Sequence, residues 1–179
     1  VMVYNVPSRT GINITPDTLR RLAALPNIIG VKEASGNLGQ ISQICSDASD
    51  TFSVLSGDDE YALPVMAVGG LGVISVISNE APSEMSALVN AALQGDFVTA
   101  LSVHKRLLPL MQINFVESNP IPVKAALAKM GLMSAHYRLP LVAPQEPSSR
   151  RIVEVLRDLG LLNGVPRKTP SDGPVSSET

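Results

Sequence analysis

The sequence predicts an α/β fold: the C-terminal half of a (β/α)8 TIM barrel, with about four parallel strands, followed by an α-helical C-terminal domain. Apolar segments of strand length alternate with helical patterns over residues 1–80, and no strand pattern follows Pro82. The 179 residues are too few for a whole barrel of about 250 residues. An open four-stranded sheet starting abruptly at Val1 would leave a long apolar edge unpaired, so we expect half a barrel from a longer protein.

The strands are expected where short runs are apolar without a break, as in parallel strands that are buried on both faces. Pro7 stops the first run and Lys32 closes the second. The expected strands are Val1–Asn5, Ile28–Val31, Phe52–Leu55 and Gly72–Val76. Their spacing leaves room for one helix between neighbours, which is the pattern of right-handed βαβ units.

Helical spacing of apolar residues fills the gaps between these strands. Thr15 is expected to cap the first helix, with Pro16 at its first position. Residues 8–11 are expected to form a loop before it. The other two helices are expected over residues 38–44 and 61–68.

Four further helices are expected after Pro82, and Asp96 and Pro147 mark two of their starts. We expect residues 1–80 to form the half barrel, and residues 81–163 to form its closing helix and the helical domain. Residues 164–179 are rich in Pro, Ser and Thr and have few apolar side chains, so we expect a disordered tail.

Charge and composition exclude several classes of function. The 14 basic and 16 acidic residues give a net charge of −2, which leaves no basic surplus for binding nucleic acid. No apolar run reaches the roughly 18 residues of a membrane-spanning helix. The single cysteine, Cys45, lies on an apolar helical stripe; it excludes an internal disulfide framework and suits the reducing cytoplasm.

Lys32 is the first candidate for catalysis, because active sites of parallel α/β folds lie at the carboxyl ends of strands. A lysine is rarely buried unless it is paired or needed. Burial disfavours the charged ammonium and leaves a nucleophilic amine, which attacks ketones to form a Schiff base. The alternative is a structural Lys32 that lies past the strand end and pairs with Asp58 or Glu33 in solvent.

Tyr4 and Arg9 belong to the neighbouring strand end. Tyr4 precedes Lys32 by about one βα repeat, so its phenol can lie beside the amine and shuttle protons during imine formation. Alternatively, Tyr4 is a core aromatic whose hydroxyl bonds a backbone carbonyl. Arg9 can hold a carboxylate with two parallel hydrogen bonds; alternatively, it is a solvated loop residue.

Other chemistry-bearing residues favour structural interpretations. The acidic run 58–60 suggests a divalent metal site, but it lies where a helix begins, and acidic residues are favoured there. His104 and His136 are far apart and lack metal-ligand spacing. The glycine-rich run Gly69–Gly72 precedes a strand instead of a helix, so it does not fit a dinucleotide-binding motif. We expect neither a metal nor an organic cofactor.

Five motifs, in order along the chain, resemble the dihydrodipicolinate synthase family. They are Tyr4–Gly11 (YNVPSRTG), Gly30–Asn37 (GVKEASGN), Leu55–Asp59 (LSGDD), Gly72–Val76 (GVISV) and Asn119–Lys124 (NPIPVK). The resemblance runs from Val1 to about Leu162 and covers the C-terminal half of the family's chain. It implies a TIM barrel with a helical C-terminal domain, usually a homotetramer, that acts in lysine and diaminopimelate biosynthesis.

The family reaction condenses pyruvate with L-aspartate 4-semialdehyde to give 4-hydroxy-tetrahydrodipicolinate. By this resemblance, Lys32 is the Schiff-base lysine that binds pyruvate, Tyr4 relays protons, and Arg9 holds the carboxylate of the semialdehyde. Gly57 and Ile74 occupy positions where the family lines the pyruvate pocket, largely through backbone groups. The covalent Schiff base takes the place of a cofactor.

The resemblance also implies that the family's first four strands are absent, with the residues that hold the carboxylate of pyruvate. We therefore expect the fragment alone to be inactive. One alternative is another pyruvate-dependent class I aldolase, such as an N-acetylneuraminate lyase, although those enzymes resemble the loop at Arg9 less well. The other is a non-catalytic half barrel that acts as an interaction module.

Overall fold

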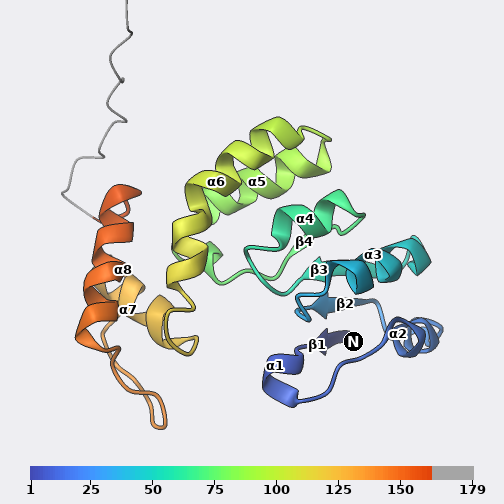
Figure 1. Cartoon of the computed structure of the whole chain (residues 1–179), viewed down its shortest axis with the longest axis horizontal. Coiled ribbons are helices and arrows are strands. Elements are labelled where there is room, and N and C mark those ends of the chain that lie inside the picture. The colour runs from blue at the N-terminus through green and yellow to red at the C-terminus, as the bar shows by residue number, and fades with distance from the viewer. Residues whose placement is uncertain (163–179) are drawn as a thin grey trace, which may run out of the picture.

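The computed structural model describes residues 1–162, and its centre is one parallel sheet (Figure 1). The strands are β1 (Met2–Asn5), β2 (Gly30–Glu33), β3 (Ser53–Ser56) and β4 (Gly72–Val73). They lie in the order β1-β2-β3-β4, and each neighbouring pair is parallel. The predicted four-stranded parallel sheet is confirmed. The predicted disordered tail, residues 164–179, lies outside the described residues.

Helices join the strands and then continue beyond the sheet. Between strands lie α1 (Pro7–Thr10), α2 (Pro16–Ala23), α3 (Leu38–Asp47) and α4 (Ala62–Ala67). After β4 come the 3-10 turn η1 (Ile77–Asn79) and α5 (Pro82–Leu93), α6 (Phe97–Ile113), α7 (Ile121–Lys129) and α8 (Glu146–Asp158). As predicted, the Thr15 side chain caps α2, accepting a hydrogen bond from the backbone N–H of Thr18. The four predicted helices after Pro82 are present.

Two aspects of the strand prediction are wrong in detail. β2 runs from Gly30 instead of Ile28, and β4 ends at Val73 instead of Val76. The side chains of Ile29 and Ile74 are 56% and 40% exposed, so these segments are not buried on both faces. At β2 the reason is that the described core packs against one face of the sheet, where α2 and α3 cover it, whereas Val73 of β4 packs against the core formed by the later helices.

The segment after β1 also differs from the expected loop, because residues 7–10 form the short helix α1. Pro7 stands at its first position, where its ring favours the helical backbone and its missing N–H costs nothing. Gly11 ends the helix with a left-handed backbone, at φ 72°. This turn places Arg9 on a fixed element close to the end of β1.

Register divides the side chains of the sheet between its two faces. Val3, Val31 and Val54 are aligned across β1, β2 and β3, and they belong to the core formed with α2 and α3. One residue further along, Tyr4 is aligned with Lys32 and Lys32 with Leu55. Since successive side chains of a strand point to opposite faces, this second row lies on the face away from α2 and α3.

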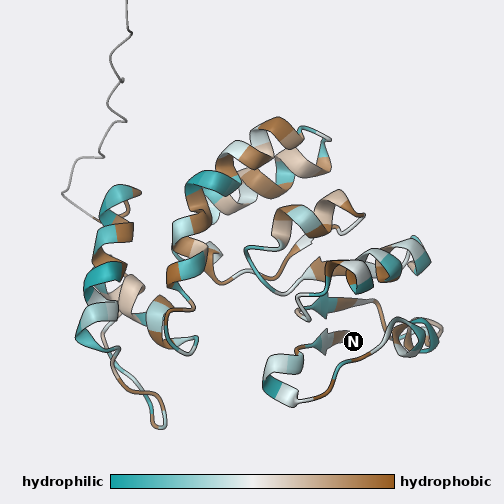
Figure 2. Ribbon diagram, in the orientation of Figure 1, coloured by the Kyte–Doolittle hydropathy of each residue, from teal (hydrophilic) through white to brown (hydrophobic). Residues whose placement is uncertain are grey.

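A second, larger hydrophobic core joins α4 and η1 to the helices that follow the sheet. Its most buried members include Ile77, Leu88, Leu107, Leu110, Met111 and Leu156. Apolar segments of α4, α5 and α6 face one another in this region (Figure 2). The core therefore fixes the C-terminal end of α6, and the segment that follows it, relative to the sheet.

Gly30 supports a test of the pairing that positions Lys32. A Cβ atom added to Gly30 would lie 2.3 Å from the backbone oxygen of Ser53, and backbone cannot move aside without separating β2 from β3. We expect Gly30→Ala to lower the free energy of unfolding by about 1–3 kcal/mol, as overpacking does. Urea unfolding of the purified chain measures this effect.

Gly39→Ala, on α3, is the matched control. Its added Cβ would have as its nearest neighbour only the side-chain oxygen of Asn37, at 3.4 Å. A Gly30→Ala variant as stable as this control would contradict the described pairing of β2 with β3.

Candidate active site

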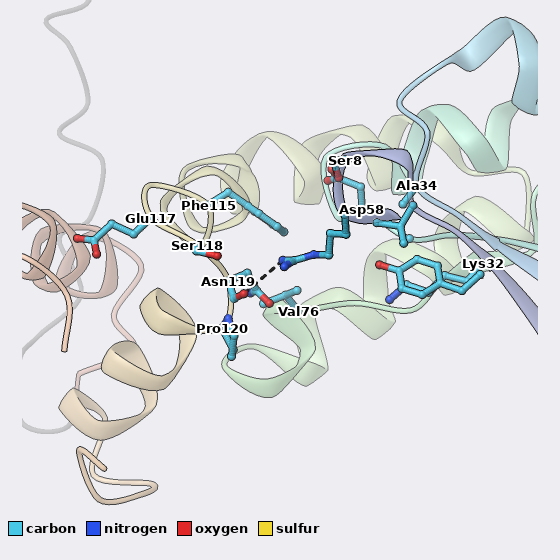
Figure 3. A pocket seen from close by; sticks show the side chains of 14 residues that line it. Ser8, Lys32, Ala34, Asp58, Val76, Phe115, Glu117, Ser118, Asn119 and Pro120 are labelled. Carbon is cyan, nitrogen blue, oxygen red and sulfur yellow. Dashed lines mark hydrogen bonds between the residues drawn. The ribbon is translucent and has the colours of Figure 1, made fainter. Parts of the chain in front are cut away.

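A cavity of about 750 Å³ opens at the carboxyl ends of β1, β2 and β3. One wall comes from the ends of the strands and the segments after them, and the other comes from beyond β4 and from the segment after α6. The lining residues are Tyr4, Val6, Ser8, Arg9, Lys32, Ala34, Gly57 and Asp58 on the first wall, and Val76, Phe115, Glu117, Ser118, Asn119 and Pro120 on the second. Figure 3 shows Lys32 and Ala34 across the cavity from Asn119 and Pro120.

The Lys32 ammonium lies over the face of the Tyr4 ring, with Nζ 4.2 Å from the ring centroid. An ammonium is attracted to the negative face of an aromatic ring at this distance. Among the described residues Lys32 forms no ion pair, so the alternative of pairing with Asp58 or Glu33 is wrong. Tyr4 is 45% exposed, so it is not a core aromatic either. The pair is open to a small molecule that enters the cavity.

Arg9 joins the two walls of the cavity. Its Nη2 donates a hydrogen bond to the backbone oxygen of Asn119 at 3.2 Å, drawn as a dashed line in Figure 3. The alternative of a freely solvated loop arginine is therefore wrong, although the residue is exposed. A guanidinium carries five N–H donors, so a carboxylate in the cavity can still be held by the others.

Gly57 makes room for the Lys32 side chain. A Cβ atom at Gly57 would lie 2.7 Å from the Cβ of Ala34 and 3.2 Å from Cε of Lys32. The backbone N–H of Gly57 donates to the Glu33 carbonyl at 2.7 Å, which holds it at this close approach. The first wall thus depends on a residue without a side chain.

Ile74 is the one predicted site residue that does not line the cavity. Its backbone N–H donates to the Ser56 carbonyl at 2.8 Å, and its side chain is partly exposed. Val76, two residues further along the chain, lines the cavity instead. The structure therefore brings together Tyr4, Arg9, Lys32 and Gly57.

A buried polar network supports the strand ends that carry Tyr4 and Lys32. Nδ2 of Asn5 donates to the Glu33 carboxylate at 2.9 and 3.2 Å, and the N–H of Ser35 donates to it at 2.7 Å. The side-chain oxygen of Asn5 accepts from the N–H of Ile14 at 3.0 Å. Both side chains are 1% exposed, and they fix the segments that leave β1 and β2. The sequence contained a signal for this pair: each residue directly follows one of the predicted site residues.

The acidic run 58–60 lies just before α4 but does not cap it; two of its carboxylates accept hydrogen bonds from backbone N–H groups instead. Asp58 accepts from the N–H of Glu60 at 3.0 Å. Asp59 is buried, and it accepts from the N–H groups of Val76 and Ile77 at 2.9 and 3.0 Å. Burial raises the pKa of the Asp59 carboxyl above its usual range. Within residues 1–162, no three His, Cys, Asp or Glu side chains gather as a metal site would require.

The second wall is the part of the site that sequence reasoning missed. Phe115, Glu117 and Ser118 belong to no strand end, and they reach the cavity because the larger core positions the end of α6. The sequence signal for this wall was the motif that begins at Asn119. From helical periodicity alone, this motif indicates only the start of α7. The two histidines do not line the cavity, and burial lowers the pKa of His104.

Comparison with known proteins identifies the family of this chain. The profile of the Dihydrodipicolinate synthetase family matches residues 1–159. The chain belongs to this family. A 4-hydroxy-tetrahydrodipicolinate synthase of Koribacter versatilis is 51% identical over 163 residues, a match that covers 90% of this chain and 54% of that protein.

Solved structures of the family share the fold. A dihydrodipicolinate synthase from Thermotoga maritima matches with a TM-score of 0.88 and 45% identity, covering 90% of this chain and 55% of that one. A chloride-inhibited dihydrodipicolinate synthase from Acinetobacter baumannii, complexed with pyruvate, matches with a TM-score of 0.87 and 40% identity, over 90% and 55%. The chain thus spans about half the length of the family members it matches. None of its described helices is long and apolar enough to cross a membrane.

Gly57→Ala tests whether the Lys32–Tyr4 contact requires a residue without a side chain at position 57. We expect the added methyl group to move Lys32 away from the ring, because it would contact Cε directly. Protons of the Lys32 side chain over the Tyr4 ring are shifted upfield by its ring current, so a carbon–proton NMR spectrum reports their displacement. The shift is expected to shrink in Gly57→Ala, to vanish in Tyr4→Leu and to persist in Gly39→Ala. An unchanged shift in Gly57→Ala would contradict the contact.

Proposed function

We propose that this chain provides the Schiff-base lysine of a 4-hydroxy-tetrahydrodipicolinate synthase, which condenses pyruvate with L-aspartate 4-semialdehyde. The observation that carries the proposal is the Lys32–Tyr4 contact in a cavity whose rim holds Arg9. Family membership and the synthases that the chain matches support this choice of reaction. The Acinetobacter relative, crystallised with pyruvate, supports the choice of ketone.

The first step of the proposed reaction joins Lys32 to pyruvate. The neutral Nζ attacks the ketone carbon, and the carbonyl oxygen leaves as water when the imine forms. Two protons must move from nitrogen to oxygen on the way. The Tyr4 phenol lies beside this amine, and a phenol can both accept and donate them.

The second step makes the new carbon–carbon bond. The imine withdraws electrons, so the methyl group of bound pyruvate loses a proton and an enamine forms. The enamine carbon then attacks the aldehyde carbon of the semialdehyde, whose oxygen takes up a proton. Arg9 holds the carboxylate of the semialdehyde at the rim, and Gly57 contributes its backbone near pyruvate.

The family to which the chain belongs also supports proposals on the complete fold, the assembly and the cofactor requirement. We propose that the sheet is the C-terminal half of a TIM barrel and that α5–α8 include the family's C-terminal helical domain. The catalyst is then complete only with the remaining segments, as a homotetramer in the cytoplasm, and the 179 residues alone are inactive. The imine is itself the electron sink, so the chemistry uses no metal or organic cofactor.

The decisive experiment supplies the remaining segments from a relative. We propose a hybrid in which residues 1–162 replace the matching segment of the Koribacter versatilis synthase, 51% identical to this chain. With pyruvate and borohydride, we expect a reduced pyruvyl adduct on Lys32, located by peptide mass spectrometry, because borohydride reduces the imine irreversibly. Lys32→Arg keeps the positive charge and is expected to give no adduct.

Tyr4→Phe keeps the ring under the ammonium and removes the phenol, so adduct formation should slow by about 10²- to 10⁴-fold without stopping. A folded hybrid that forms no adduct would contradict the proposed synthase reaction. It would favour the alternative of a non-catalytic interaction module.

Arg9 gives a prediction that separates the two substrates. We expect Arg9→Ala in the hybrid to raise KM for the semialdehyde at least about tenfold, since a charge-assisted contact is lost. Trapping of pyruvate on Lys32 should stay close to that of the unmodified hybrid. Steady-state kinetics with each substrate varied in turn measures both effects. Equal losses for pyruvate and the semialdehyde would contradict the role of Arg9.

A further inference from the structure

A second buried polar cluster lies behind the cavity, away from Lys32. It consists of Asp59 after β3, Glu80 after η1 and Asn114 at the end of α6. Their exposed fractions are 1%, 3% and 0%. Each belongs to a segment that reaches the cavity nearby, at Asp58, at Val76 and at Phe115. The proposed reaction uses none of the three.

The cluster has more acceptors than donors. Nδ2 of Asn114 donates to Oε2 of Glu80 at 2.6 Å and to the Leu110 carbonyl at 3.2 Å. Within residues 1–162, Oε1 of Glu80 and Oδ1 of Asn114 are both buried and have no hydrogen-bond partner, and neither has Oδ1 of Asp59. An unpaired buried oxygen destabilises the fold, so three together demand an explanation.

A single proton accounts for two of these oxygens. A carboxylic acid and an amide form two antiparallel hydrogen bonds when the acid keeps its proton, and one of the two bonds between Glu80 and Asn114 is already present. We propose that Glu80 is a neutral acid that donates its Oε1 proton to Oδ1 of Asn114, and that this acid–amide pair positions the cavity wall 115–119.

The surrounding charges favour the neutral acid. Asp59, from the segment between β3 and α4, is the charged group that acts on Glu80, and its negative charge opposes a second one. Two basic groups on the neighbouring helices have partners elsewhere: Arg106 pairs with Glu84, and Lys124 lies over the Tyr137 ring. Burial, together with Asp59, raises the pKa of Glu80 from 4.5 to about 8, so the acid keeps its proton at neutral pH.

The pair matters for the site because it joins both sides of the second wall. Glu80 follows the turn that Asp59 holds through the N–H groups of Val76 and Ile77. Asn114 directly precedes the residues that line the cavity opposite Lys32, including Asn119, which accepts the hydrogen bond of Arg9. Glu80 is therefore a positioning residue, acting on the wall through Asn114.

Infrared spectroscopy of the 179-residue chain tests the proton directly. A protonated carboxyl group has a carbonyl stretch above the amide band, and we expect one such band at neutral pH that fades above about pH 8. Glu80→Gln, which keeps both hydrogen bonds with an amide, should lack the band. Glu154→Gln, on the exposed side of α8, makes the same Glu-to-Gln replacement away from the cluster and should retain the band. Absence of the band from the parent chain at neutral pH would overturn the proposal.

The pH dependence of stability gives a second test. The folded state keeps a proton that the unfolded state loses above pH 4.5, so the free energy of unfolding falls as pH rises toward about 8 and is level above it. Glu80→Gln should remove this part of the decline, so its Tm should match the parent chain in mild acid and exceed it above pH 8. Glu154→Gln should follow the parent chain. A Glu80→Gln profile parallel to that of the parent would also overturn the proposal.

The consequence for catalysis rests on the proposed function and is measured in the hybrid. Glu80→Gln should preserve KM for the semialdehyde at neutral pH, whereas Glu80→Ala should raise it severalfold and leave trapping of pyruvate on Lys32 intact. Equal KM values in both variants would show that the pair does not position the wall. Failure of trapping in the parent hybrid would reject the synthase reaction, while the infrared band still decides the state of Glu80.

Discussion

The parallel register of β1 against β2 is the constraint on which the site depends. It places Tyr4 beside Lys32, and the next residues along, Asn5 and Glu33, also face each other. The first pair meets in the cavity, whereas the second forms the buried network on the opposite face. A shift of one residue would exchange these roles, because alternate side chains of a strand point to opposite faces. One register thus sets both the reactive pair and its support.

The separation of side chains between the two faces of the sheet also bears on why Lys32 lies over a ring and not beside a carboxylate. Three acids are close to it in sequence or at the ends of the strands: Glu33, Asp58 and Asp59. Each is occupied with hydrogen bonds from backbone or amide groups. An adjacent carboxylate would favour the charged ammonium, and charge on the nitrogen prevents attack on a ketone. The local acids therefore stabilise loops, and no carboxylate within residues 1–162 forms an ion pair with the amine.

Sequence patterns could predict the sheet and the first wall, because both depend on local signals. Strand spacing and the alternation of elements were enough to align Tyr4, Lys32 and the segment of Arg9. The second wall depends on the packing of α6 in the larger core, and no periodicity assigns the end of a helix to a cavity. Ile74 shows a limit of the family resemblance, which places this residue at the pyruvate pocket: β4 ends at Val73, and Val76 lines the cavity instead. The Glu80–Asn114 pair lies in helical and turn sequence that gives no sign of a buried acid.

The bond between Arg9 and Asn119 has a consequence for the order in which the site is assembled. It joins residues 110 positions apart, whereas the contact of Asn5 with Glu33 joins residues 28 apart. Closing the longer loop costs about 1.2 kcal/mol more chain entropy. The network that supports the Tyr4–Lys32 pair is therefore made of contacts between segments close in sequence, whereas the rim of the cavity includes a distant contact. The rim therefore depends on the packing of α6 in the larger core, whereas the contact of the amine with the ring depends on the pairing of β1 with β2.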